Sequence, residues 1–370
     1  MFRINHDGES RSRTGFLTTG HGVIETPCFM PVATRATLRT MDSRDLEETN
    51  SSMIICNAFL LSLRPGNEEL NRNSGIHSFM NWKGSIFTDS GGFQMIRKGF
   101  LQKISDQGIT LRSPYDGRKI SVTPEDVVSW IKSQRPDFGM ILDDLPPHGS
   151  NSERNNQSVN RTILWAQRSI EHYRSLDLDG STTGLFAILQ GGIDATERRR
   201  CIDSISELDF PGHGIGGLSI GESKDEMLSS VDLTTSLLPP EKPVYLMGVG
   251  SPVELLECIS RGVDIFDSVY PARNARHHTV LTFSGKYSIR TAKNKGDSRP
   301  LEDDCQCPIC QNYSRSYIHH LVRTGEFGWM RLVSIHNLFF TQRLMKKARI
   351  AITENSLGDL VEEVRTSYKK

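Results

Sequence analysis

Short apolar runs recur along the chain, and each ends in polar residues or glycine. Eight such runs cover residues 27–32, 53–57, 85–89, 140–143, 185–190, 214–218, 244–248 and 263–267. Because they are apolar at consecutive positions, not only at alternating ones, they are typical of parallel strands that are buried on both faces.

The segments between these runs carry helix signals. Thr123-Pro124-Glu125-Asp126 combines an N-cap residue, a proline at the first helical position and acidic residues in the first turn. Further helices are expected over residues 43–47, 151–176, 194–208, 223–238 and 251–261. Eight strands that alternate with helices predict an α/β fold, a (β/α)8 TIM barrel. The alternative is a doubly wound open sheet, but no G-x-G-x-x-G motif follows the first strand.

Two stretches do not fit a bare barrel. Tyr115-Asp116-Gly117 separates two β-prone pieces and predicts a hairpin. Residues 268–335 hold two further β-prone pieces and a cysteine cluster, and predict an inserted subdomain. The expected organisation is an N-terminal antiparallel cap over residues 1–26, a barrel over 27–267, the insertion over 268–335, and a final barrel helix with a C-terminal helix over 336–370.

The inserted subdomain carries the strongest local motif. Cys305, Cys307 and Cys310 follow one another in C-x-C-x2-C spacing, and His336 follows Cys310 after 25 intervening residues. Three thiolates and one imidazole fit a tetrahedral zinc ion. Because four protein ligands leave no position for water, we expect one structural zinc ion per chain. His319 and His320 are nearer in the sequence and are alternative fourth ligands.

Composition narrows the class of protein. No apolar run approaches the ~20 residues of a membrane helix, and the first 20 residues lack the apolar core of a secretory signal. Seven cysteines, an odd number, argue against a secreted disulfide scaffold. We therefore expect a cytoplasmic protein without a membrane segment.

The charge is distributed unevenly along the chain. The formal net charge is zero, from 44 basic and 44 acidic residues, but residues 241–370 carry 19 basic and 14 acidic residues. Residues 268–299 alone hold seven basic side chains and one acidic side chain, Asp297; the basic residues include Arg273, Arg276, Lys286 and Arg290. Such a run forms either a solvated loop or a phosphate-binding face.

The ends of the predicted strands are unusually polar. They hold Asp89, Asp143 with Asp144, Gln190, Gly216 with Gly217, Gly248 and Asp267. One aspartate after a strand is often a helix N-cap, but the strand ends of a barrel share one rim, where active sites lie. With Phe93 and Met247 as stacking faces, this rim predicts a pocket for a flat heterocycle. Paired carboxylates also suit displacement at an anomeric carbon.

Several motifs resemble those of the tRNA-guanine transglycosylase family. They are Asp89-Ser-Gly-Gly-Phe-Gln, Leu189-Gln-Gly-Gly, Gly214-Ile-Gly-Gly-Leu, Tyr245-Leu-Met-Gly-Val-Gly, Asp264-Ile-Phe-Asp-Ser-Val-Tyr-Pro-Ala-Arg, Leu63-Arg-Pro-Gly, Ser334-Ile-His-Asn and the cysteine cluster. They run in order from about residue 10 to about residue 350. The resemblance implies a zinc-containing barrel that exchanges guanine at the tRNA wobble position (position 34, GUN anticodons) for a 7-deazaguanine base, queuine or preQ1.

The resemblance also implies a role for individual residues. Asp267 matches the nucleophile of a double displacement through a covalent enzyme–tRNA intermediate, and Asp89 matches the acid/base. The matches to base-binding residues are Ser90, Phe93, Asp143, Gln190, Gly216, Gly217 and Met247. Arg273 and Arg276 would lie beside the anticodon, with Lys286 and Arg290 in the same basic run. His336 is favoured as the fourth zinc ligand.

The chain departs from the usual family pattern at several positions. Ser268 replaces the usual cysteine after the nucleophile, Ala58-Phe59-Leu60 replaces Thr-Tyr-His near the dimer contact, and Leu145 follows the Asp143-Asp144 pair. The Asp-Asp pair favours queuine, whereas bulky Ile220 does not, so both bases stay open.

Other functions and the oligomeric state complete the set of predictions. An archaeosine-type exchanger usually carries extra C-terminal domains, a non-catalytic partner subunit would lack the nucleophile, and a zinc hydrolase would need an open metal site. The family implies a homodimer, with Tyr313, Tyr317 and His320 as expected interface residues.

Overall fold

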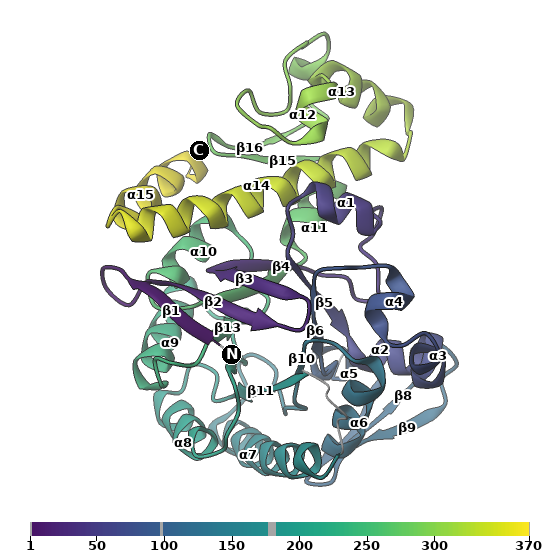
Figure 1. The fold of residues 1–370 in the computed structure, drawn as a ribbon, viewed down its shortest axis with the longest axis vertical. Coiled ribbons are helices and arrows are strands. Elements are labelled where there is room, and N and C mark those ends of the chain that lie inside the picture. Colours follow the sequence, from purple (N-terminus) through teal and green to yellow (C-terminus); the bar gives the residue numbers. More distant parts are fainter. Residues whose placement is uncertain (1, 97–98, 177–182, 370) are drawn as a thin grey trace.

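Eight parallel strands form the centre of the computed structural model, which describes residues 2–96, 99–176 and 183–369. Their order is β4-β14-β13-β12-β11-β10-β6-β5. The strands are β4 (Cys28–Pro31), β5 (Met53–Asn57), β6 (Ser85–Asp89), β10 (Phe138–Met140), β11 (Gly184–Leu189), β12 (His213–Ile215), β13 (Val244–Leu246) and β14 (Ile265–Ser268). A parallel bridge between Val32 and Ile55 brings the two ends together, with 2.7 Å between Ala33 N and Ile55 O. This closure confirms the barrel and excludes the open sheet (Figure 1).

The strands form where the apolar runs predict them. All residues of β4, β5, β10, β12 and β13 are buried, as expected for strands packed on both faces. Three strands end two or three residues before their apolar runs do: β10 ends at Met140, β12 at Ile215 and β13 at Leu246. The polar residues that follow therefore lie on loops above the strand ends.

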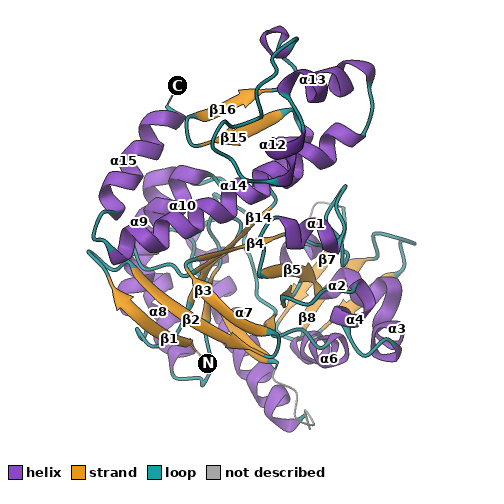
Figure 2. Ribbon diagram, turned by 45° about the horizontal axis from the view of Figure 1, so that its top comes forward, coloured by secondary structure: helices purple, strands orange, loops and turns teal. Residues whose placement is uncertain are grey.

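Helices surround the barrel and connect its strands (Figure 2). They are α1 (Ser43–Glu48), α2 (Ala58–Leu61), the π-helical turn η1 (Ser62–Gly66), α3 (Asn67–Arg72), α4 (Ile76–Met80), α5 (Gly92–Met95), α6 (Pro124–Gln134), α7 (Ser152–Ser175), α8 (Ala195–Ser206), α9 (Lys224–Leu237), α10 (Pro252–Ile259) and α11 (Tyr270–Arg276). At α6, Thr123 and Asp126 form a capping box and Pro124 occupies the first turn, as its sequence predicts.

An antiparallel sheet of β1 (Phe2–Asp7), β2 (Arg13–Thr19) and β3 (Gly22–Thr26) covers the N-terminal ends of the barrel strands. Two buried carboxylates hold it there. Arg13 Nε and Nη2 donate to Asp264, immediately before β14, at 2.9 and 2.7 Å. His21 Nδ1 lies 2.9 Å from Asp137 Oδ1, immediately before β10. The opposite, C-terminal rim of the barrel is not covered by this sheet (Figure 1).

Two further β structures project from the barrel. The predicted hairpin is part of an antiparallel sheet of β7 (Leu101–Ser105), β8 (Gly108–Arg112) and β9 (Lys119–Val122). After β14, the hairpin of β15 (Thr279–Thr282) and β16 (Gly285–Ser288), the 3-10 turn η2 (Ala292–Asn294), α12 (Pro308–Asn312) and α13 (Arg315–Thr324) lie to one side of the barrel.

The long helix α14 (Gly328–Thr353) separates this part from the barrel, and α15 (Leu357–Tyr368) ends the chain (Figure 1). Sixteen residues of α14 are buried, since it packs against both β4 of the barrel and β15. Within the residues that the structure describes, no helix is both long and apolar enough to cross a membrane.

Candidate active site and metal centre

Asp267 lies at the C-terminal end of β14, where neighbouring groups fix its carboxylate. The Tyr245 hydroxyl donates to Oδ1 at 2.7 Å, and the Gly248 backbone N–H donates to the same oxygen at 2.9 Å. Among the described residues, no donor contacts the second oxygen, Oδ2. Burial raises the pKa of Asp267, and the two hydrogen bonds lower it in part. One oxygen is therefore anchored while the other is available for reaction.

Asp89 lies at the end of β6 and is electrostatically coupled to Asp267. Burial raises the pKa of Asp89 to about 6, with a further rise from the negative charge of Asp267; hydrogen bonds from the Gly91 and Ser90 N–H groups and from the Asn57 amide lower it in part. Asn57 Nδ2 lies 3.3 Å from Asp89 Oδ2. A carboxyl group with a pKa near neutrality can both give and accept a proton.

Asp143 and Gln190 form a second polar group on the same rim. Gln190 Nε2 donates to Asp143 Oδ2 at 2.6 Å, and both side chains are buried. Burial raises the pKa of Asp143 to about 7, and the negative charges of Asp89 and Asp144 add to the rise, against the Gln190 hydrogen bond. The charge of Asp267 therefore acts on Asp89, and the charge of Asp89 acts on Asp143, as expected from their place on one rim.

Glycine residues bring the backbone close to this polar group. A Cβ added at Gly92 would lie 3.0 Å from Asp143 Oδ1, and one at Gly217 would lie 2.6 Å from Gln190 Oε1. Gly217 also has a φ of +72°, a conformation that favours glycine. The loops after β6 and β12 can thus lie directly against Asp143 and Gln190, which follow β10 and β11.

The other predicted base-binding residues occupy the same loops. Ser90 is buried, and its hydroxyl accepts a hydrogen bond from Gly92 N at 3.2 Å, which holds the turn after β6. Phe93 in α5 is 50% exposed and lies in the segment that follows β6. Met247 follows β13, and its sulfur would lie 3.7 Å from a Cβ added at Gly214.

The predicted RNA-binding residues are divided between two places. Arg273 and Arg276 lie on α11, which starts just beyond β14. Burial lowers the pKa of Arg276, and the charges of Arg39 and Arg273 lower it further, so three guanidinium groups lie near one another. Arg290 follows the end of β16 that pairs with Thr279. Lys286 lies near the other end of the hairpin, where the structure separates it from α11.

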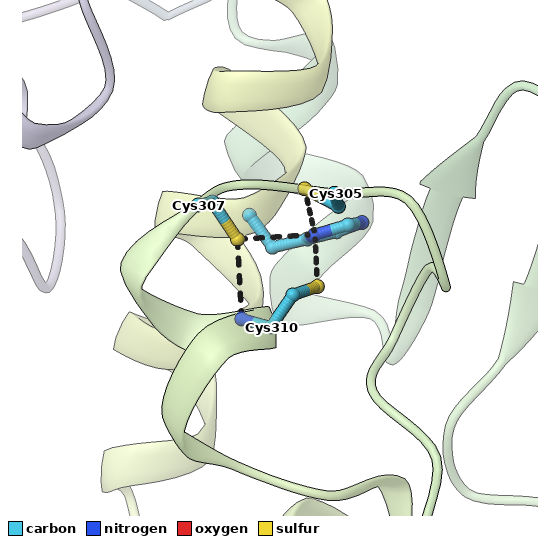
Figure 3. Close-up of side chains that lie close together, drawn as sticks. Cys305, Cys307 and Cys310 are labelled. Atoms are coloured by element: carbon cyan, nitrogen blue, oxygen red, sulfur yellow. Dashed lines mark hydrogen bonds between the residues drawn. The ribbon is translucent and has the colours of Figure 1, made fainter.

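Cys305, Cys307, Cys310 and His336 form a compact buried cluster that could hold a metal ion (Figure 3). The three sulfurs lie 3.7, 3.6 and 3.3 Å from His336 Nδ1. A tetrahedral zinc ion, with Zn–S of about 2.3 Å and Zn–N of about 2.1 Å, sets the S–N distance at about 3.6 Å. The donor set and its spacing therefore fit zinc.

The second ring nitrogen of His336 orients the imidazole. His336 Nε2 lies 2.9 Å from the Leu281 carbonyl oxygen, so the proton on Nε2 is donated and Nδ1 faces the sulfurs. His319 Nδ1 instead lies 2.9 Å from the Ile289 carbonyl oxygen, outside the cluster. This placement identifies His336 as the fourth member of the cluster, in place of His319 or His320.

A second group of candidate ligands, His21, His77 and Asp137, lies at the opposite end of the barrel. The two imidazole rings are stacked, with centroids 3.5 Å apart and an interplanar angle of 13°. Lone pairs in nearly parallel planes do not converge on one ion. Asp137 also accepts a hydrogen bond from Ile86 N at 2.8 Å. The group therefore fits a clamp for the N-terminal sheet better than a metal site.

Sequence reasoning did not assign a role to three residues that position this site. Tyr245 was only part of a motif, although its hydroxyl binds Asp267. Asn57 contacts Asp89 and also donates to Gln94 Oε1 at 2.9 Å. Arg198 belongs to a charged run in α8 but is completely buried beneath the glycine loops. The strand-end position of Asn57 and the motif that contains Tyr245 offered a signal, whereas nothing in the sequence singled out Arg198.

Comparisons with known proteins agree with this geometry. The family model described as queuine tRNA-ribosyltransferase matches residues 7–370. A protein named queuine tRNA-ribosyltransferase from Thermoanaerobacter sp. (strain X514) is 43% identical over 365 residues, which cover 99% of this chain and 96% of that protein. A protein of the same name from Lysinibacillus sphaericus (strain C3-41) is 44% identical over 361 residues, which cover 97% of this chain and 93% of that protein. The chain therefore belongs to the queuine tRNA-ribosyltransferase family.

Proposed function

We propose that this protein is a tRNA-guanine transglycosylase that replaces guanine at wobble position 34 of GUN anticodons by queuine or preQ1. Family membership supports the reaction class, a pentosyl transfer. The observation that carries the proposal is the rim of the barrel, where the charge of Asp267 raises the pKa of Asp89 and the charge of Asp89 raises the pKa of Asp143, both in addition to burial. A nucleophile, an acid/base and a base-recognition group are thereby combined in one site.

In this proposal Asp267 Oδ2 attacks ribose C1′ of the target nucleotide. The C1′–O bond forms while the C1′–N9 bond to guanine breaks, and the bonding electron pair leaves with guanine. Tyr245 and Gly248 hold Oδ1, which leaves Oδ2 without a protein donor among the described residues. The product is a covalent enzyme–tRNA intermediate.

Asp89 carries the proton in both halves of the reaction. Its protonated form gives a proton to the departing guanine, and the resulting carboxylate takes the N9 proton of the incoming base. N9 then attacks C1′, and the C1′–O bond to Asp267 breaks. Two inversions at C1′ give retention. The pKa of Asp89, about 6, supports this exchange near neutral pH.

Asp143, Gln190 and Gly217 would recognise the polar edge of the base. The Asp143 carboxylate can accept from the N1–H and 2-amino groups, and the Gly217 N–H can donate to the 6-oxygen. Phe93 and Met247 would stack on the two faces of the ring, with Ser90 and Gly216 shaping the loops. Both queuine and preQ1 share this edge, so the geometry supports either base.

The metal and the RNA complete the proposal. Cys305, Cys307, Cys310 and His336 would hold one zinc ion, which would cross-link α14 to α12 and the segment before it and have no chemical role. Arg273, Arg276, Lys286 and Arg290 would contact tRNA phosphates, and the protein would act as a cytoplasmic homodimer. Chemistry on an RNA base requires the nucleotide to flip out of its stack.

Exchange of labelled guanine out of a tRNA with a GUN anticodon tests the proposal directly. The wild-type protein should release label on addition of preQ1 or queuine, run in parallel to establish which base is used. Asp267→Asn should abolish exchange and trapping of a covalent tRNA adduct under denaturing electrophoresis. Full exchange by Asp267→Asn would refute the assignment of the nucleophile.

A further inference from the structure

Arg198 is a fully buried arginine without a carboxylate partner. It lies in the first turn of α8, and its relative exposure is 0%. None of the described Asp or Glu side chains lies within 4.0 Å of its guanidinium. Charged side chains are rarely buried in this way unless they are paired. The hydrogen bonds of Arg198 therefore have to offset an unfavourable environment.

These hydrogen bonds go to the two glycine loops of the base pocket. Nε and Nη2 donate to the Gly192 carbonyl at 2.9 and 2.6 Å, and Nη2 also donates to the Gly216 carbonyl at 3.1 Å. Gly192 follows β11 and Gly216 follows β12. A single planar guanidinium thus cross-links the two loops from below.

This cross-link determines where a backbone donor points. The peptide bond between Gly216 and Gly217 is trans, since the cis bonds of the described chain precede Pro27 and Pro65. In a trans peptide the C=O and N–H point in opposite directions. Because the Gly216 C=O points at Arg198, the Gly217 N–H points away from it, and it has no acceptor among the described residues.

The same peptide lies against the polar group of the pocket. A Cβ at Gly217 would meet Gln190 Oε1 at 2.6 Å, and Gln190 in turn donates to Asp143. The Gly217 N–H is therefore beside the side chains that would recognise the base. A guanidinium bound to the carbonyl of a peptide also polarises its N–H and makes it a better donor.

We propose that Arg198 is a positioning residue for base selection, which aims the Gly217 N–H at the 6-oxygen of guanine and of 7-deazaguanine bases. This inference rests on the proposed function. Arg198 contacts neither the base nor the reacting atoms. Burial lowers the pKa of Arg198 to about 10, so that the side chain stays charged at neutral pH.

The test compares Arg198→Met with Arg199→Met, a matched control in the exposed neighbour. Binding of guanine and 6-thioguanine is measured by calorimetry, because the thio base keeps N1–H and the 2-amino group but has a weaker acceptor at position 6. Arg198→Met should bind guanine about tenfold more weakly than the wild type does, which is the effect of one hydrogen bond. Its preference for guanine over 6-thioguanine should also be smaller than that of the wild type. In exchange assays KM for the base should rise while kcat stays within about threefold.

Several outcomes would overturn the inference. A folded Arg198→Met protein that binds both bases as the wild type does would refute it, as would an equal loss in Arg199→Met. If Arg198→Met does not fold, Arg198→Lys keeps the charge but cannot bridge both carbonyls in the same fork, and wild-type selectivity in that variant would also refute it.

A measurement on the wild-type protein avoids the risk of misfolding. In glycine-labelled protein, the Gly217 amide resonance should move downfield when guanine binds, and an unmoved resonance would contradict the inference. Wild-type protein that does not bind guanine would instead refute the proposed function, and this inference with it.

Discussion

The Tyr245 hydroxyl donates a hydrogen bond to Asp267 Oδ1 across 2.7 Å, from the neighbouring strand of the barrel. Burial and the negative charge of Asp267 raise the pKa of Tyr245 well above its ordinary value, so the hydroxyl stays protonated and always donates. The bond fixes which carboxylate oxygen is occupied and lowers the pKa of Asp267 against the effect of burial.

Tyr245→Phe should slow formation of the covalent intermediate without loss of tRNA binding. A hydrogen bond to a charged group contributes about 1.5–3 kcal/mol, so the rate should fall by about 10- to 100-fold. The pKa of Asp267 should rise, since a donor to its ionised form is lost. Single-turnover adduct formation at several pH values measures both effects, and an unchanged rate would contradict the role given to Tyr245.

Asp89→Asn should lower the pKa of Asp143. The charge of Asp89 disfavours ionisation of Asp143, whose pKa is about 7, so removal of that charge favours the carboxylate. If ionised Asp143 recognises the base, the pH at which guanine binding reaches half its maximum should move to lower pH. Calorimetric titrations between pH 5 and pH 8.5 measure this midpoint.

The matched control for that shift is Asp45→Asn, which removes a buried carboxylate of α1 that pairs with Arg331 of α14 and is not among the charges that act on Asp143. Its binding midpoint should equal that of the wild type. A midpoint that stays in place in Asp89→Asn would show that the two carboxylates are not coupled.

Cys307→Ala should remove the metal and destabilise the part of the chain beyond the barrel. A structural zinc site contributes several kcal/mol to folding, so thermal unfolding should begin at a lower temperature. Proteolysis should cut first between β15 and α13. Cys258→Ala, a buried thiol of α10 outside the cluster, should lose packing but keep one metal ion per chain. Elemental analysis measures the zinc content of both variants, and one zinc ion per chain in Cys307→Ala would refute the ligand set.

Arg273→Ala and Arg276→Ala should each weaken tRNA binding and reduce its salt dependence. A lost phosphate contact lowers the slope of log affinity against log salt by about one. Arg174→Ala, at the exposed C-terminal end of α7, should change neither quantity, because that end lies on the far side of the barrel from the proposed site. Equal slopes in all three variants would exclude α11 as a phosphate-binding element.

The sequence predicts the barrel well because buried parallel strands leave a local signal, a run of apolar residues that ends in polar ones. It also predicts the cysteine cluster, since three of four ligands lie within six positions. It does not predict Arg198, because Glu197-Arg198-Arg199-Arg200 is typical of a solvated helix face. Only the packing of α8 against the glycine loops distinguishes the first arginine from the next two.

Contacts between strands are equally hidden from the sequence. The bond of Tyr245 to Asp267 depends on which strands are neighbours and on which side chains point inward. The position of Lys286 depends on the register of a hairpin, which places it away from Arg273 and Arg276. The basic run is continuous along the chain but divided in space.

Strand β14 is held at both of its ends. Below it, the buried ion pair between Arg13 and Asp264 ties the start of the strand to the N-terminal sheet. At its other end, Tyr245 and Gly248 donate hydrogen bonds to Asp267, three residues after Asp264. The carboxylate that carries the attacking oxygen is therefore held in place, and it has little freedom to move toward the ribose. In the proposed reaction the conformational change therefore falls to the RNA, since the anticodon must unfold until its ribose reaches the carboxylate.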